Sequence, residues 1–171
     1  MRGTLVVSLI GWSDSGKTSL VVRAIEECVR RGIECAAAKC SHHTGDFELE
    51  GKDSARYREA GASPVAYIGT GPGGQTACFV PTPIEPGREW LESLFPESIL
   101  IFVEGLEVEG AINVLVDKEG MALKRPLAWS DILVSGNNEH AIQAIGSGKK
   151  VISPGDAKSL VDIVEESWIG K

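Results

Sequence analysis

Nine residues near the start of the chain, Gly11 to Ser19, read GWSDSGKTS and fit the pattern G-x-x-x-x-G-K-[ST] in full. Glycines at these positions let backbone N–H groups turn towards phosphate oxygens, and the following helix presents a partially positive N-terminus. Lys17 is expected to reach the β- and γ-phosphates, and the Thr18 hydroxyl to bind Mg²⁺. The predicted phosphate-binding residues are Gly11, Trp12, Ser13, Asp14, Ser15, Gly16, Lys17, Thr18 and Ser19.

An acidic residue, Glu104, directly follows the apolar run in the segment SILIFVEG. Such a run predicts a buried strand, and ligands of α/β sheets bind beyond the carboxyl ends of the strands. A carboxylate there can hold Mg²⁺ or orient an attacking water. A solvated glutamate at a strand end is the alternative interpretation.

A polar cluster containing His42, His43 and Asp46 follows the second predicted strand and is expected at the same edge. Polar contacts to a substrate or phosphate are favoured over a metal site, because neighbours in an extended chain point to opposite sides. A plain polar loop also remains open. Asp53 begins a short predicted helix, where it could either cap that helix or approach the Mg²⁺.

The choice of base is the least determined feature of the sequence. The N-K-x-D tetrapeptide, with which many GTPases read guanine, does not occur. Asn137 and Asp156 each follow a late predicted strand and are the candidates for a base contact, since an aspartate can accept from the guanine N1–H and N2–H groups. Asp156 is equally suited to cap the last helix.

The elements that position these residues alternate between strand and helix. Thr4 to Ile10 is a predicted buried strand, Lys17 to Arg31 an amphipathic helix and Ile33 to Lys39 a second strand, which together make a βαβ unit. Further strands are predicted at 98–103, 111–116, 132–134 and 150–152. Residues 65–80 read as a hairpin around GTGPGG. We therefore expect one α/β domain over residues 1–171, with a mostly parallel sheet, helices on both faces and an added antiparallel β-element.

Composition restricts the partners of this domain. The 171 residues carry a net charge of −7 with a pI near 5.0, which argues against a broad nucleic-acid or anionic-membrane surface. No apolar stretch is long enough to cross a bilayer, and the N-terminus lacks a cleavage pattern, so a cytoplasmic location is expected. The four cysteines form no C-x-x-C pair and read as reduced thiols.

Four segments in order, GWSDSGKTSL, AAKCSHH, GKDSARYREAGA and IFVEGL, resemble the MobB family of molybdopterin-guanine dinucleotide biosynthesis proteins. The resemblance covers most of the chain and weakens after about residue 120. It implies a P-loop fold that binds GTP with Mg²⁺, hydrolyses it weakly, and forms homodimers. It also implies assistance to a partner enzyme that attaches GMP to molybdopterin.

Carried over by position, the resemblance makes Gly11 to Ser19 the phosphate site and Glu104 the strand-end acid. Lys17, Glu104 and Asp53 become the catalytic candidates, and Thr18, Asp53 and Glu104 the metal candidates. The residues implied to line the cleft are His42, His43, Asp46, Lys52 and Asp53. Cys40 stands where a histidine of a KHTHH-like run is expected, which weakens any role that needs three nearby imidazoles.

Two other functions remain compatible with a phosphate loop. A small-molecule kinase needs a closing lid with basic side chains, and the segment DKEGMALKRPLAW offers Lys118, Lys124 and Arg125. A non-enzymatic adaptor could use a bound nucleotide only to fix its shape. Release of nucleoside diphosphate that depends on an acceptor would indicate the kinase, and binding without turnover would indicate the adaptor.

Overall fold

A computed structural model of the chain describes residues 4–40, 67–70, 76–79, 87–95 and 99–169. The chain divides into two units, Met1–Cys40 with Gly87–Lys171, and Ser41–Pro86. In the second unit, β3 (Tyr67–Thr70) and β4 (Thr76–Phe79) pair antiparallel. All other described elements belong to the first unit, as do all described residues of the site discussed below.

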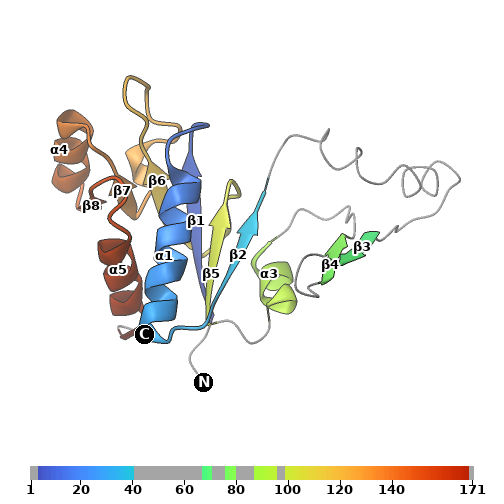
Figure 1. The fold of residues 1–171 in the computed structure, drawn as a ribbon. Helices are drawn as coiled ribbons and strands as arrows, with labels where there is room; N and C mark the ends of the chain where they lie inside the picture. The colour runs from blue at the N-terminus through green and yellow to red at the C-terminus, as the bar shows by residue number, and fades with distance from the viewer. Residues whose placement is uncertain (1–3, 41–66, 71–75, 80–86, 96–98, 170–171) are drawn as a thin grey trace, which may run out of the picture. The chain divides into compact units, whose positions relative to one another are not determined.

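The first unit is built on six parallel strands in the order β2-β5-β1-β6-β7-β8. Figure 1 shows the helices connecting these strands. The strands are β1 (Leu5–Gly11), β2 (Cys35–Lys39), β5 (Leu100–Glu104), β6 (Ile112–Val116), β7 (Ile132–Val134) and β8 (Lys150–Ile152); the helices are α1 (Lys17–Arg31), α3 (Arg88–Leu94), η1 (Leu127–Trp129), α4 (Asn138–Gly146) and α5 (Ala157–Ile169). The α/β class and the parallel sheet are confirmed, and β2 begins two residues later than predicted.

Alternate residues of the central strands face two different layers of helix. Leu5, Val7 and Leu9 of β1 pack in one cluster with α1 and α5, whereas Val6 packs with Leu91 of α3 on the opposite face. Burial of these apolar side chains, at roughly 25 cal/mol per Å², supplies the main stabilising force. Helices therefore cover both faces of the sheet, as predicted.

The amphipathic pattern predicted for residues 17–31 explains how α1 is held against the sheet. Leu20, Val21, Ala24 and Cys28 are buried against the sheet and α5. Arg31 contributes a second tie, because its guanidinium bonds to Glu27 on the same helix and to residues of α5. The helix that follows the phosphate loop is thus fixed on two sides.

Register places the ends of three strands at one edge. Glu104 of β5 lies opposite Leu9 of β1 on one side and Lys39 of β2 on the other. These are the carboxyl ends of parallel strands, where ligands of α/β sheets bind, and Glu104 of the predicted site lies there. Among the described residues, no helix has the length and apolarity that crossing a membrane requires.

Candidate functional site

The loop between β1 and α1 has the backbone of an anion-binding turn. Gly16 precedes the helix with φ = 90°, a conformation that favours glycine, and Asp14 has φ = 57°. Positive φ in a non-glycine residue is uncommon and concentrates at functional sites. Helix α1 has no side-chain cap and no acidic residue in its first turn. Its first N–H groups are therefore free of side-chain acceptors and suited to an anion.

Lys17 is folded back onto this loop. Its Nζ donates to the Trp12 carbonyl at 2.6 Å and lies 3.4 Å from the Ser15 hydroxyl. Burial is the main cause that lowers the pKa of Lys17, and the nearby charges of Lys124 and Lys39 lower it further, against an opposing effect of Glu104. The ammonium thus occupies a partly desolvated position where phosphate oxygens are better acceptors than a carbonyl.

Glu104 meets the end of the same loop through Thr18. The Thr18 hydroxyl lies 2.9 Å and 2.8 Å from the two carboxylate oxygens, and Lys39 Nζ lies 3.6 Å from Oε1. The Glu104 side chain is only 12% exposed. The turn beyond it needs glycine, since Gly105 has φ = 85° and a Cβ there would lie 2.5 Å from the Cys40 carbonyl oxygen.

The Thr18–Glu104 pair fits a magnesium ion chemically. Mg²⁺ prefers hard oxygen ligands and commonly uses one or two protein groups, with water and phosphate oxygens completing its shell. A hydroxyl and a carboxylate supply such oxygens. The described residues hold no cluster of three or more His, Cys, Asp or Glu side chains that could bind a metal without a nucleotide. The predicted residues His42, His43, Asp46, Lys52 and Asp53 lie outside the described residues.

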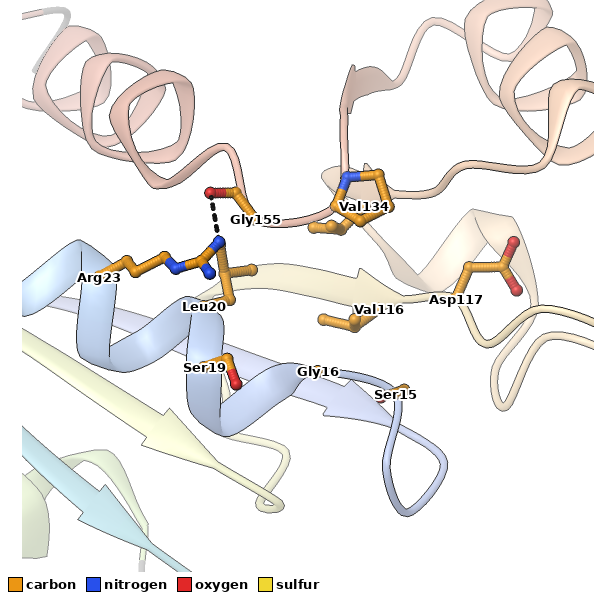
Figure 2. A pocket seen from close by; sticks show the side chains of 10 residues that line it. Ser15, Gly16, Ser19, Leu20, Arg23, Val116, Asp117, Val134 and Gly155 are labelled. Carbon is orange, nitrogen blue, oxygen red and sulfur yellow. Dashed lines mark hydrogen bonds between the residues drawn. The ribbon is translucent and has the colours of Figure 1, made fainter.

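A cavity of about 220 Å³ opens beside the phosphate loop (Figure 2). Apolar side chains from α1, β6 and β7 form much of its wall, and the Arg23 side chain lies across one end, where Nη1 is 3.5 Å from the Gly155 carbonyl oxygen. The lining residues are Ser15, Gly16, Ser19, Leu20, Arg23, Val116, Asp117, Val134, Pro154 and Gly155.

One lining residue, Asp117, is a buried acid with specific partners. Its side chain is only 4% exposed, and Oδ2 accepts from the Ser135 hydroxyl at 2.6 Å and lies 2.8 Å from His140 Nδ1. A carboxylate can only accept, so the shared proton belongs on Nδ1. The other oxygen, Oδ1, has no hydrogen-bond partner among the described residues. A buried acceptor in that state is costly and is a candidate for a ligand or water contact.

The two residues predicted for base recognition begin helices. Asn137 Oδ1 accepts from the backbone N–H groups of Glu139 and His140 and so caps α4. Asp156 accepts from the Ser159 N–H at 3.0 Å and from its hydroxyl at 2.7 Å, which lowers the pKa of Asp156. Their structural role is thereby established, and a base contact stays a prediction.

Seven residues of the cavity wall were absent from the sequence prediction. Most are apolar or glycine and carry no chemical signal: Leu20, Val116, Val134, Pro154 and Gly155. Arg23 and Asp117 are the two charged exceptions. Asp117 follows the apolar strand INVLV directly, just as Glu104 follows LIFV, and that parallel could have identified it.

Comparison with known proteins agrees with the resemblance seen in the sequence. A family model described as "Molybdopterin guanine dinucleotide synthesis protein B" matches residues 6–134. The molybdopterin-guanine dinucleotide biosynthesis adapter protein of Haemophilus influenzae is 32% identical over 135 residues, covering 78% of this chain and 74% of that protein. The Escherichia coli adapter protein is 31% identical over 181 residues, covering 100% and 98% of the two chains.

A solved structure supports the fold. The crystal structure of Bacillus subtilis MobB aligns with a TM-score of 0.69 over 98% of this chain and 99% of that one, at 24% identity. At that identity the likeness establishes the fold alone. Together with the family model and the two relatives, it shows that the chain belongs to the MobB family.

Proposed function

We propose that this chain is a GTP-binding accessory protein of molybdopterin guanine dinucleotide synthesis, with weak GTP hydrolysis. The observation that carries the proposal is the phosphate loop, whose Thr18 hydroxyl bonds to the strand-end carboxylate of Glu104. These two groups come from separate motifs, 86 residues apart, and meet at the edge where P-loop proteins hold Mg²⁺ and phosphates.

In this proposal, the phosphates of the bound nucleotide replace the hydrogen bonds that the loop makes within itself. The N–H groups at the start of α1 would donate to the β-phosphate, and Lys17 would leave the Trp12 carbonyl for phosphate oxygens. Mg²⁺ would be held by Thr18 and Glu104 and would neutralise charge on the nucleotide.

The nucleoside suits the adjoining cavity. Ser15, Gly16 and Ser19 line it from the loop and the first turn of α1, so a nucleotide with its phosphates in the loop directs its sugar and base there. The walls supplied by Leu20, Val116 and other apolar residues suit a planar base. Guanine donates from N1 and N2, and selection of GTP over ATP would require the buried Oδ1 of Asp117, which has no partner among the described residues, to turn towards the base.

The names of the relatives support an assisting role. Both curated relatives are adapter proteins of molybdopterin-guanine dinucleotide biosynthesis. We place this chain in the same step, where it would form a homodimer and dock with the enzyme that attaches GMP to molybdopterin. Nucleotide binding would then set the shape offered to that partner, and hydrolysis would be secondary.

Reconstitution tests this role. The purified partner enzyme would be supplied with molybdopterin and Mg²⁺-GTP, and dinucleotide formation followed with wild type, with Lys17→Ala and without this chain. We expect wild type to stimulate formation and Lys17→Ala to fail. Equal rates with and without wild type would contradict the proposal. Parallel assays of GDP or ADP release with candidate acceptors would identify a kinase if release depended on the acceptor.

A further inference from the structure

The segment between β6 and η1 contacts the phosphate loop through three side chains. Trp12 Nε1 donates to the Ala122 carbonyl at 2.7 Å, and Lys118 Nζ donates to the Ser13 carbonyl at 2.8 Å. Lys124 Nζ lies 4.9 Å from the centroid of the Trp12 ring. Two lysines from outside the phosphate-loop motif are therefore held against the first residues of the loop.

These contacts are weak compared with what the same groups could make with phosphate. The Trp12 side chain is partly exposed, and a cation over an exposed ring gains less than an ammonium that bonds a phosphate oxygen. Arg125 differs from both lysines, because its guanidinium already pairs with Glu107 at 2.5 Å.

The surrounding charge also favours an anion at this point. Burial is the main cause that lowers the pKa of Lys17, and the charges of Lys124 and Lys39 lower it further. Glu104 opposes them with a larger effect than either lysine alone, and Asp14 opposes them more weakly. A multiply charged anion would reduce the repulsion that Lys124 and Lys39 exert on Lys17.

The position of the lysines along the loop indicates which phosphate they meet. The cavity is lined by Ser15, Gly16 and Ser19 and not by Trp12 or Ser13. A nucleotide whose nucleoside fills the cavity therefore has its terminal phosphate towards Trp12 and Ser13. Lys118 and Lys124 contact just these two residues.

We infer that residues 118–124 form a clamp for the terminal phosphate of a nucleoside triphosphate, in which Lys124 exchanges the Trp12 ring for that phosphate. The clamp rests on the proposed nucleotide site and adds to it a discrimination between triphosphate and diphosphate. Lys118, held to the Ser13 carbonyl, keeps the segment against the loop in both states. The segment thus couples the state of the nucleotide to the surface formed by residues 118–124.

Calorimetric affinities test the clamp with Mg²⁺-GDP and with the Mg²⁺ complex of the non-hydrolysable analogue guanylyl imidodiphosphate. Lys124→Ala should weaken binding of the triphosphate analogue about tenfold, since one charge-assisted contact is lost, and leave GDP affinity unchanged. Lys124→Arg should retain the preference for triphosphate. Arg125→Ala is the matched control on the same segment and should alter neither affinity.

Trp12 fluorescence supplies a readout that does not depend on affinity. The triphosphate analogue should change the emission of wild type more than GDP does, because only the triphosphate draws Lys124 from the ring, and Trp12→Phe should remove that difference. If Lys124→Ala left the ratio of the two affinities unchanged, either because neither fell or because both fell equally, the clamp alone would be overturned. Failure of wild type to bind either nucleotide would overturn both the clamp and the proposed function.

Discussion

The phosphate loop and the neighbouring cavity are built in opposite ways. The phosphate-loop side takes nearly all of its chemistry from Gly11 to Ser19, and one distant acid, Glu104, joins it through Thr18. The cavity side is assembled from α1, from the last residues of β6 and β7, and from the segments that follow β6 and β8. One side is therefore determined by local sequence, and the other by how the strands are ordered in the sheet.

Polar groups serve different purposes on the two sides. Around the phosphate loop, the N–H groups of α1 have no side-chain cap, and Lys17 holds only a carbonyl and a hydroxyl. On the cavity side, Asn137 and Asp156 are occupied with helix N-termini, and Asp117 is tied to Ser135 and His140. The first side is open to a ligand, whereas the second is mostly committed to its own structure.

Removal of the Lys17 ammonium should have the largest effect. Lys17→Ala is expected to weaken Mg²⁺-GTP binding by about 100-fold or more, because charge-assisted contacts to phosphate are lost. The free energy of unfolding should stay unchanged, since Lys17 is not one of the buried apolar residues of α1. Calorimetry and urea denaturation measure the two quantities. Unchanged affinity in this variant would refute the phosphate-loop assignment.

Glu104→Gln should separate turnover from binding. Glutamine keeps the size of the side chain and an acceptor for Thr18, but it lacks the charge that holds Mg²⁺ and polarises water. GTP hydrolysis should fall about 100-fold, the usual scale for loss of a group that acts on the attacking water, while affinity for metal-free GTP stays unchanged. Single-turnover assays and titrations in EDTA provide the comparison. If the rate of GTP hydrolysis and the affinity for metal-free GTP fell together, Glu104 would be a structural group.

Asp117→Asn tests the cavity side without altering the loop. An amide oxygen in the place of Oδ2 can still accept from both Ser135 and His140, but the amide nitrogen in the place of Oδ1 becomes a buried donor without a partner among the described residues, and the fold should lose about 1–3 kcal/mol. GTP affinity should also fall, whereas inorganic tripolyphosphate, which has no base, should bind as to wild type. Urea denaturation and competition titrations measure these effects. Equal losses for GTP and tripolyphosphate would show that the two sides are not separable.

The caps on the cavity side should give the smallest effects. Asn137→Ala and Asp156→Ala are each expected to cost about 1 kcal/mol of stability, as is usual for a lost N-cap, without changing GTP affinity. A selective loss of GTP over ATP binding in either variant would instead assign that residue to the base.

The Asp156 contribution should also depend on pH. Hydrogen bonds from Ser159 hold the pKa of Asp156 below its ordinary value. A carboxyl depressed in this way stabilises the fold above its unfolded pKa of about 3.9, and the contribution is lost as pH falls through the lower folded pKa. The stability difference between wild type and Asp156→Ala should therefore shrink in acid. Urea denaturation at a series of pH values measures it, and a constant difference would exclude the charged cap.

The contrast between local signals and contacts between distant segments also explains which elements could be predicted from the sequence. Helix α1 was predicted with its observed bounds, because its apolar stripe and Gly32 stop are local signals. Helix α4 was missed, because Ile142 and Ile145 are 70% and 64% exposed and only Ala144 is buried, so the apolar pattern does not mark a buried face. The start of this helix is marked by the Asn137 cap, whose side chain accepts from the backbone of Glu139 and His140.

The cavity could not be predicted, because neighbours in it are distant in sequence. Val116, Val134 and Pro154 come together only through the order β1-β6-β7-β8. The antiparallel pair was expected within residues 65–80, and β3 and β4 lie there, although β3 runs to Thr70, into the predicted turn.

The measurement that tests the account most directly is calorimetric titration of wild type with GTP and with ATP, each with and without Mg²⁺. The loop, the Thr18–Glu104 pair and the free acceptor of Asp117 together predict saturable binding that is strengthened by Mg²⁺ and favours GTP. Binding without a preference for GTP would leave the phosphate loop in place and remove the role given to Asp117. No binding of either nucleotide would contradict the account.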